Sequence, residues 1–333
     1  MKSIHIAILG ATGAVGQTML EVLLERKFPY RKLTLLASCR SAGKEVSVNG
    51  QNFVIQEATP QSFKGVDLVL CAAENNVAGF FIPYAVKAGA IVIDNSSAYR
   101  LDPSVPLIIP EVNKEAIKHH QGIIANPNCA TIIALVALAP LHRYAHITRM
   151  IVSTYQAVSG AGIGGMKELN DQMQALADHK PIQTKYFPYQ IAYNLIPQIG
   201  DFNDKGYSSE EMKMQNEGRK ILNAPNLAVN CTCVRVPTMR SHAESITIEF
   251  DEPIDVSTAK ELLINAPGIK LVDDPINARY PMPLESQNQD LIYVGRIRED
   301  ISTDKHGLSL WCCGDQIRKG AATNAIQIAE TFL

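Results

Sequence analysis

Residues 4–24 of this 333-residue chain read IHIAILGATGAVGQTMLEVLL, and this segment specifies the architecture of the N-terminal part. Ile4 to Leu9 form a short apolar run of the kind that a buried parallel strand needs. A turn of small residues follows, Gly10-Ala11-Thr12-Gly13-Ala14-Val15-Gly16, and apolar residues recur at helical spacing from Met19 onward. Small residues in such a turn let the backbone approach a pyrophosphate, which then lies on the helix N-terminus. The segment therefore predicts a dinucleotide-binding strand, turn and helix.

The end of the next predicted strand, residues 33–37, bears on which dinucleotide is bound. An acidic residue there would accept the ribose hydroxyls of NAD. The chain has instead Ser38-Cys39-Arg40-Ser41, and its first carboxylate after the strand is Glu45. A guanidinium with two hydroxyls suits the 2′-phosphate of NADP. We therefore expect NADP(H) as the cofactor, and the alternative for Arg40 is a solvated surface arginine.

Further apolar runs predict more sheet in the N-terminal part, at residues 52–56, 66–73, 90–94 and 122–125, with a helix over residues 77–88. This alternation predicts an open, mostly parallel, doubly wound α/β sheet. After about residue 130 the strand candidates are longer and separated by long loops; they lie at 147–155, 227–236, 245–250, 292–299 and 307–313. We interpret this part as an α+β domain with a mixed or antiparallel sheet. A final helix from Gly320 can return to the first domain.

Composition excludes several functional classes. The chain has 31 basic and 33 acidic residues, and neither a basic block nor a charged tail, so we expect no nucleic acid and no membrane as partner. It has no signal-peptide pattern and no run approaching the roughly 20 apolar residues of a membrane span. Its seven cysteines are an odd number and lack C-x-x-C spacing. These features predict a reduced, cytoplasmic protein without a metal site.

The run Asn126-Pro127-Asn128-Cys129-Ala130-Thr131 places one cysteine between a turn and an apolar helix. Asn-Pro stops the preceding strand, so Cys129 is expected in the first turn of the helix. Unpaired backbone N–H groups and the positive end of the helix dipole there lower the pKa of a thiol. The same N–H groups can hold an oxyanion. Cys129 is therefore a candidate nucleophile, and the alternative is a buried cysteine that only packs.

Three further segments are too polar and too rich in glycine for a core, and each follows a predicted strand. They are DNSSAYR at 94–100, QAVSGAGIGG at 156–165 and RVPTMRSHAE at 235–244. We expect each to place reactive or anion-binding groups just past a strand end.

The motifs GATGAVG, DNSSAYR, NPNCAT, YQAVSGAG, EEMKM and RVP followed by SHAES occur in this order along the chain. Through these motifs and their order, the whole chain resembles the aspartate-semialdehyde dehydrogenase family. The resemblance implies NADPH-dependent conversion of β-aspartyl phosphate (L-aspartyl 4-phosphate) to aspartate β-semialdehyde, at the branch to lysine, threonine and methionine. It also implies a homodimer formed through the sheet of the second domain.

The resemblance implies roles for three residues around the thiol. Cys129 would attack the acyl phosphate and form a thioester, which hydride from NADPH would reduce. His242 would be the acid/base partner, because an imidazole with a near-neutral pKa can activate a thiol and move protons. Gln156 would orient the substrate. On the residues alone, His242 can equally be a surface-loop histidine, and Gln156 an ordinary polar residue at a strand end.

Other residues match the family's binding positions. Arg235 would hold the substrate α-carboxylate with its planar fork, and Glu210 would meet the substrate ammonium. Lys213, Arg100 and Asn128 would bind the phosphate. On the residues alone, Arg235 can be a surface strand arginine, while Glu210 and Lys213 favour a solvated helix face, with Glu211 as a neighbouring alternative. The implied cofactor contacts are Gly10, Thr12, Gly13, Ala14, Val15, Arg40, Ser41, Ser159, Gly160 and Gln316.

These observations predict two domains. Residues 1–128 with 315–333 form a Rossmann-like NADP-binding domain, and residues 129–314 form the catalytic, substrate-binding and dimerisation domain. A short-chain reductase is a rival interpretation of the glycine motif, but no tyrosine is followed by lysine four positions later. A second rival is an inactive paralogue that binds NADPH as a sensor or scaffold; the presence of Cys129, Gln156, Arg235 and His242 argues against it.

Overall fold

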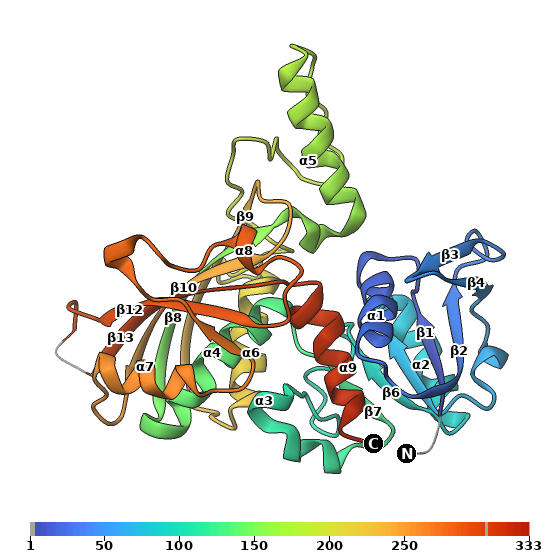
Figure 1. Cartoon of the computed structure of the whole chain (residues 1–333), viewed down its shortest axis with the longest axis horizontal. Coiled ribbons are helices and arrows are strands. Elements are labelled where there is room, and N and C mark those ends of the chain that lie inside the picture. The colour runs from blue at the N-terminus through green and yellow to red at the C-terminus, as the bar shows by residue number, and fades with distance from the viewer. Residues whose placement is uncertain (1–3, 304–305, 333) are drawn as a thin grey trace. The chain divides into compact units, whose positions relative to one another are not determined.

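The computed structural model describes residues 4–303 and 306–332 of the chain (Figure 1). Its contacts divide the chain into two compact units: residues up to Asn128 together with those from Ala321 onward, and Cys129–Gly320. We expected the return to the first unit at residue 315. The structure differs because Asp315 and Gln316 are tied to the second unit, where they accept hydrogen bonds from Asn288 N (2.6 Å) and Ser241 N (2.8 Å).

The first unit contains a mostly parallel sheet, as predicted. Within the described residues its seven strands follow the order β3-β4-β2-β1-β5-β6-β7, and only β3 and β4 pair antiparallel. The strands are β1 (Ile4–Leu9), β2 (Tyr30–Ala37), β3 (Glu45–Val48), β4 (Gln51–Glu57), β5 (Leu68–Cys71), β6 (Ile91–Asp94) and β7 (Ile123–Ala125). β1 pairs with both β2 and β5, so it lies in the middle of the sheet.

Helices cover both faces of this sheet. Alternate residues of β1 point to opposite faces: Ile6 and Ile8 pack with α1 (Ala14–Glu25) and α9 (Thr323–Glu330), whereas Ala7 and Leu9 pack with α2 (Asn75–Lys87). The final helix thus belongs to the first unit. The turn between β1 and α1 lies at the carboxyl edge of the sheet, where sheets of this kind bind ligands.

The second unit contains a mixed sheet, also as predicted. In the part of the chain that is described, its six strands follow the order β11-β12-β13-β10-β8-β9, and the β8–β9 and β11–β12 pairs are parallel. The strands are β8 (Ile147–Ala157), β9 (Ala228–Val236), β10 (His242–Phe250), β11 (Ile269–Leu271), β12 (Ile292–Glu299) and β13 (Gly307–Gly314).

The expectation of long loops between these strands holds for residues 178–208, which contain no helix or strand, but helices form much of the other connections. The connections contain α5 (Gly162–Ala177), α6 (Ser209–Ile221) and α7 (Val256–Ile264), and α5 extends away from the strands in Figure 1. The start of α6 is marked in the sequence by a capping box, in which Ser208 and Glu211 satisfy each other's backbone N–H groups. The shorter elements are α3 (Pro110–Asn113), α8 (Pro283–Ser286), 3₁₀ turns at Pro60–Phe63, Lys114–His119, Val158–Ala161 and Pro275–Asn277, and a π-turn at Arg318–Ala322.

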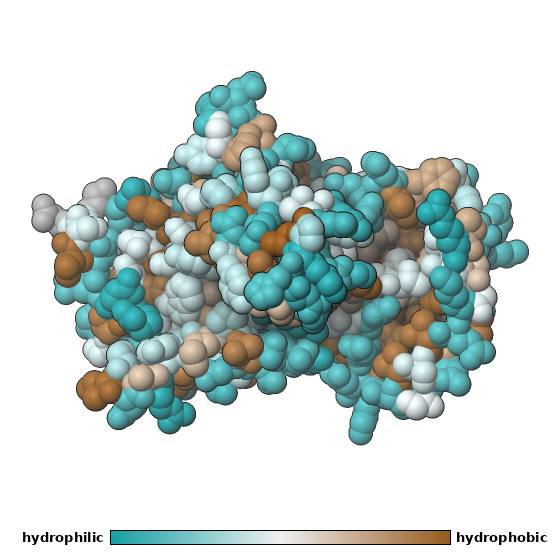
Figure 2. Space-filling model, turned by 90° about the horizontal axis from the view of Figure 1, so that it is seen from above, coloured by the Kyte–Doolittle hydropathy of each residue, from teal (hydrophilic) through white to brown (hydrophobic). Residues whose placement is uncertain are grey.

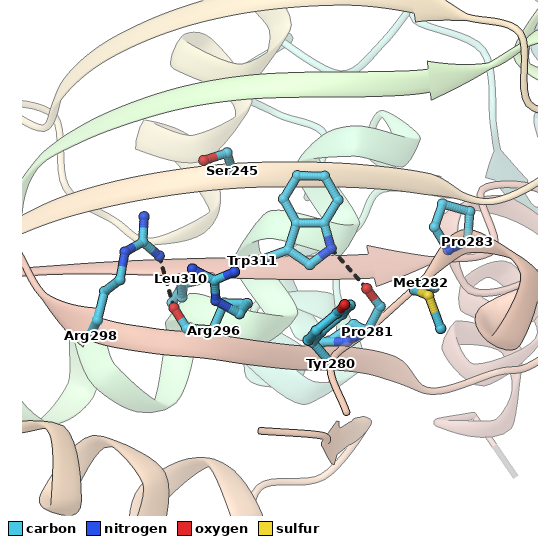
Figure 3. A pocket seen from close by; sticks show the side chains of 9 residues that line it. All are labelled: Ser245, Tyr280, Pro281, Met282, Pro283, Arg296, Arg298, Leu310 and Trp311. Atoms are coloured by element: carbon cyan, nitrogen blue, oxygen red, sulfur yellow. Dashed lines mark hydrogen bonds between the residues drawn. The ribbon is translucent and has the colours of Figure 1, made fainter. Parts of the chain in front are cut away.

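The two faces of the second sheet differ in character. α4 (Cys129–Ala145) packs on one face, where a side chain added at Gly314 would meet Ile133 of this helix at 2.9 Å. The opposite face carries polar and aromatic side chains, among them Ser245, which pairs in register with Ser153 and Trp311. Figure 3 shows a pocket of about 310 Å³ on this open face, in which Trp311 Nε1 donates to the carbonyl of Pro281 (3.0 Å).

Among the described residues, no helix has the length and apolar character to span a membrane. On the face seen in Figure 2, hydrophobic residues gather in several separate groups among hydrophilic ones.

Candidate active site

Cys129 is the first residue of α4 and is half-buried, as the sequence predicted for a thiol in the first helical turn. The chain approaches it closely at Gly320, where an added Cβ would lie 2.9 Å from the Cβ of Cys129. The first amides of a helix and its dipole favour a thiolate at this position. Cys129 is also close enough to Arg235 for the negative charge of its thiolate to raise the pKa of the guanidinium.

Gln156, Arg235 and His242 come together at one end of the second sheet. The expectation that they follow strand ends is wrong: Gln156 and Arg235 are paired in register within β8 and β9, and His242 is the first residue of β10. They are 1%, 6% and 0% exposed, so the surface interpretations of Arg235 and His242 are also wrong. Polar residues usually mark the end of a strand in sequence, but here the pairing continues through them because their side chains bond to Thr154, Glu210 and the main chain of Ala157.

His242 is held in one protonation and tautomeric state. The backbone N–H of Ala157 donates to Nδ1 at 3.0 Å, so in the neutral ring the proton is on Nε2. Burial lowers the pKa of His242 to about 3, the positive charge of Arg235 also lowers it, and Glu210 opposes the shift. The expectation of a near-neutral pKa is therefore wrong for the chain without substrate. His242 is a neutral hydrogen-bond donor at neutral pH.

The amide of Gln156 has a fixed orientation. Thr154 Oγ1 donates to its Oε1 at 2.9 Å, and its Nε2 donates to Glu210 Oε1 at 3.1 Å. The same Nε2 lies 3.4 Å from Nε2 of His242, and because both atoms are donors this is a packing contact. Thr154 was not predicted from the sequence, although it lies two positions before Gln156 and shares its sheet face.

Glu210 is not on a solvated helix face, whereas the side chain of Lys213 is 32% exposed. Glu210 is 7% exposed, and Lys213 Nζ donates to its Oε2 at 2.8 Å. The neighbouring Glu211 has a separate, structural role, because it accepts from the backbone N–H groups of Ser208 (2.6 Å) and Cys233 (3.0 Å). Of the two acidic residues, Glu210 is thus the one that faces Gln156.

Arg235 lies between anionic and carbonyl groups. Its Nη1 donates to the carbonyl of Ala157 at 2.7 Å. Burial lowers the pKa of Arg235, and the negative charges of Glu210 and of the Cys129 thiolate counteract this. An arginine keeps its charge under such conditions, so Arg235 supplies a buried cation near the thiol.

Gly160, Ser159 and Gln316 border the same cluster. A side chain at Gly160 would lie 2.6 Å from Arg235 Nη1 and 3.3 Å from His242 Cε1, so a larger residue there would displace these site groups. Gln316 donates to Ser159 Oγ and accepts from Ser241 N. The pocket of Figure 3 lies on the other face of the sheet, because Ser245 and Trp311 alternate with the residues on the α4 side.

The remaining predicted residues belong to the first unit. Gly10 has a φ of +86°, and a Cβ there would lie 2.8 Å from the carbonyl carbon of Ala72. The helix that follows begins at Ala14, and Gly13 gives it no side-chain cap. Thr12 and Gly13 therefore form a close-approach turn, and Ala14 and Val15 are the first residues of the helix; this arrangement fits a pyrophosphate.

The cofactor role predicted for Arg40 and Ser41, and the phosphate role predicted for Arg100 and Asn128, stay predictions. Arg40 and Ser41 lie in a turn after β2, and Arg40 is exposed there. Arg100 is 7% exposed and donates to the carbonyls of Asn126 (3.0 Å) and Asn95 (2.8 Å), so part of its fork holds the main chain. Asn128 is 6% exposed. No group of three or more His, Cys, Asp or Glu side chains among the described residues has a metal-binding arrangement.

The chain matches known families over both units. A family model described as "Semialdehyde dehydrogenase, NAD binding domain" matches residues 5–120, and one described as "Semialdehyde dehydrogenase, dimerisation domain" matches residues 138–319. An aspartate-semialdehyde dehydrogenase of Synechocystis is 49% identical over 330 residues, which are 99% of this chain and 97% of that protein.

Solved structures agree with these matches. The crystal structure of aspartate semialdehyde dehydrogenase II of Vibrio cholerae complexed with ASA has a TM-score of 0.96 and 46% identity, over 99% of this chain and 98% of that one. The enzyme of Candida albicans, solved with NADP, has a TM-score of 0.76 and 28% identity, over 98% of each chain. Because these matches extend over almost the full length, the chain belongs to the aspartate-semialdehyde dehydrogenase family, oxidoreductases of amino-acid biosynthesis with a nicotinamide-dinucleotide-binding domain and a dimerisation domain.

Proposed function

We propose that this chain catalyses the NADPH-dependent reductive dephosphorylation of L-aspartyl 4-phosphate to L-aspartate 4-semialdehyde and phosphate. One observation carries the proposal beyond the family: a half-buried thiol at a helix start lies near a buried cluster of Arg235, His242, Gln156 and Glu210. The product feeds the branch to lysine, threonine and methionine. The enzyme works with the small-molecule substrate and phosphate, and the family's dimerisation domain supports a homodimer.

The covalent step belongs to Cys129. Its thiolate, favoured by the helix start and by Arg235, forms a bond to the acyl carbon while the bond from that carbon to the phosphate oxygen breaks. The leaving phosphate takes up one proton from solvent. NADPH, when bound, supplies the hydride that reduces the thioester carbon. The resulting alkoxide expels the thiolate and becomes the aldehyde, so that Cys129 returns to its starting state.

The proton on Nε2 gives His242 a specific place in this sequence. A neutral imidazole that donates from Nε2 can stabilise the oxyanions formed by thiolate attack and by reduction. Its other nitrogen is occupied by the Ala157 N–H, so it has no free lone pair with which to take the thiol proton. We therefore assign His242 the stabilisation of the oxyanions as a neutral hydrogen-bond donor, and the helix start and Arg235 the stabilisation of the thiolate.

The charged groups around the thiol match the substrate. Arg235 holds the α-carboxylate in a bidentate pair, and Glu210 receives the α-ammonium, oriented by Gln156 and Lys213. Lys213, Arg100 and Asn128 bind the phosphate.

The cofactor is NADP(H), with its pyrophosphate at Thr12–Val15, its 2′-phosphate at Arg40 and Ser41, and further contacts from Ser159, Gly160 and Gln316. The open face of the second sheet, with its pocket, is the dimer surface (Figure 3).

The assay that tests the function runs in the reverse direction. Purified protein is mixed with aspartate semialdehyde, inorganic phosphate and NADP⁺, and NADPH absorbance is followed. The proposed function predicts an increase that requires phosphate. An inactive NADPH-binding paralogue predicts cofactor binding without any increase, and this result would reject the proposal.

A further inference from the structure

Glu244, on β10, is fully buried, and no step of the proposed mechanism uses it. It is 0% exposed, and neither carboxyl oxygen has a hydrogen-bond partner among the described residues. Among residues 4–303 and 306–332, no other carboxyl group has both oxygens buried and without a hydrogen-bond partner. Burial raises the pKa of Glu244 well above its ordinary value, and nearby Cys233 and Glu210 raise it further, so burial favours the carboxylic acid. A buried group left without a partner is costly, and its place in the fold requires a reason.

The sheet register places Glu244 directly behind the candidate active site. Glu244 lies opposite Thr154 of β8, and its neighbour Ser245 faces the pocket on the other side of the sheet (Figure 3). Residues opposed in this way have Cβ atoms about 5 Å apart on the same face. His242 lies two residues before Glu244 on the same strand, so both side chains point to the sheet face that α4 covers. His242 is opposite Gly314 of β13. Glu244 and Thr154 thus form the row behind His242 and Gln156.

Thr154 connects this row to the site. It is 0% exposed, and its hydroxyl hydrogen is donated to Gln156 Oε1 at 2.9 Å. A hydroxyl that donates in one direction still has lone pairs that accept from another. Glu244 lies directly across the strand pair from Thr154, and among the described residues neither of its oxygens reaches a hydrogen-bond partner, Thr154 included. One water between the two side chains would accept from the carboxyl O–H and donate to the hydroxyl.

We propose that Glu244 is a positioning residue of the active site: its carboxyl O–H donates to Thr154 Oγ1 through one water, and so fixes the orientation of the Gln156 amide. That orientation points the amide hydrogen of Gln156 at Glu210, beside His242. The chain of groups Glu244, Thr154, Gln156 and Glu210 then holds the acidic group for the substrate ammonium in place. This inference rests on the proposed function and adds a residue to it.

The variant Glu244→Met separates this role from a structural one, because it keeps the volume and removes the unpartnered polar group. If Glu244 only fills space, the variant unfolds at a higher temperature and keeps wild-type kinetics. The positioning role predicts an equal or higher unfolding temperature together with a roughly tenfold lower kcat/KM for the semialdehyde. The KM for NADP⁺ stays within about twofold, because only the substrate end of the site is disturbed.

The conservative variant Glu244→Gln retains a donor and is expected to restore kcat/KM to within about threefold of wild type. The matched control is Glu249→Met, at the far end of the same strand, where Glu249 pairs with Arg149. It is expected to keep wild-type kinetics whatever its stability. Wild-type kinetics in Glu244→Met, or equal losses in Glu244→Gln and Glu244→Met, would overturn the proposal.

A double-mutant cycle tests the route through Thr154. If Glu244 acts through this hydroxyl, the double variant Thr154→Val with Glu244→Met is no slower than Thr154→Val alone. Additive losses contradict the route. Should the wild-type protein fail to turn over the semialdehyde, the proposed function fails on its own. A crystal structure of Glu244→Met then decides the positioning role, because an unchanged Thr154 hydroxyl and Gln156 amide would reject it.

Discussion

The Cys129 thiol is the nucleophile that the protein supplies in the proposed mechanism, and there is a physical reason for sulfur at this position. Sulfur donates poorly into a carbonyl, so a thioester carbon stays electrophilic toward hydride, whereas an ester carbon is less reactive. We expect Cys129→Ser to lower reductase activity by roughly a thousandfold or more and to leave NADPH binding unchanged. Steady-state kinetics and a fluorescence titration with NADPH measure the two effects. Substantial turnover by the serine variant would reject the covalent mechanism.

The guanidinium of Arg235 is buried, so its geometry is expected to matter as much as its charge. Lysine is a point charge and does not reproduce the planar, bidentate capture of a carboxylate. We predict that Arg235→Lys raises KM and lowers kcat/KM for the semialdehyde by about 10- to 100-fold. Arg240→Lys, outside the cluster and paired with Asp315, is the control. Wild-type kinetics in Arg235→Lys would reject the carboxylate assignment.

The buried imidazole of His242 also makes a prediction about stability. Its folded-state pKa of about 3 lies below the unfolded value of 6.5, so between these values the unfolded chain binds more protons. Stability therefore falls as pH drops below about 6.5, by at most about 1.4 kcal/mol per pH unit from this residue. Urea unfolding at pH 7 and pH 5, at fixed protein concentration, should show a smaller loss in His242→Gln than in wild type. An equal loss in both proteins would contradict the assignment.

Single elements position these residues, and α6 is the clearest case. Its capping box holds Glu211 at the helix start, and Glu211 also binds the backbone of Cys233, two residues before Arg235. Ser208→Ala is expected to cost about 1 kcal/mol of stability and to raise the KM for the semialdehyde, because Glu210 is in the first turn of this helix. Asp255→Ala removes the N-cap of α7 instead. Asp255→Ala should also lower stability but leave the KM for the semialdehyde unchanged. Equal KM values in wild type, Ser208→Ala and Asp255→Ala would contradict the link between the α6 cap and the position of Glu210.

The turn after β2 is expected to determine the preference for NADP over NAD. Arg40 lies there, and no carboxylate precedes Glu45 in this turn. We expect Arg40→Ala to raise the KM for NADP⁺ on the order of tenfold and to leave the KM for NAD⁺ unchanged, since only NADP⁺ carries a 2′-phosphate. Kinetics with both cofactors measure the difference. Equal effects on the two cofactors would favour a solvated surface arginine.

For the whole molecule, the sequence was enough to predict most of the two sheets, because most strands of the first unit are short apolar runs next to a turn. The short strands β3 and β11 were not predicted. The sequence did not reveal α5, whose buried positions include the polar residues Glu168 and Gln172. It identified Gln156, Arg235 and His242 as site residues but placed them beyond the strands. Their burial depends on α4 and on neighbouring strands, and the state of His242 depends on the Ala157 N–H, which no local pattern shows. Thr154 and Glu244 emerge only from the register of the second sheet.

The mechanism as a whole requires that the sulfur at position 129 becomes bonded to the substrate during turnover. Protein can be quenched in acid while it reduces the acyl phosphate, then digested and analysed by mass spectrometry. We predict an aspartyl adduct on the peptide that contains Cys129, which is absent from Cys129→Ser. An adduct on another residue, or turnover without any adduct on this peptide, would refute the covalent mechanism.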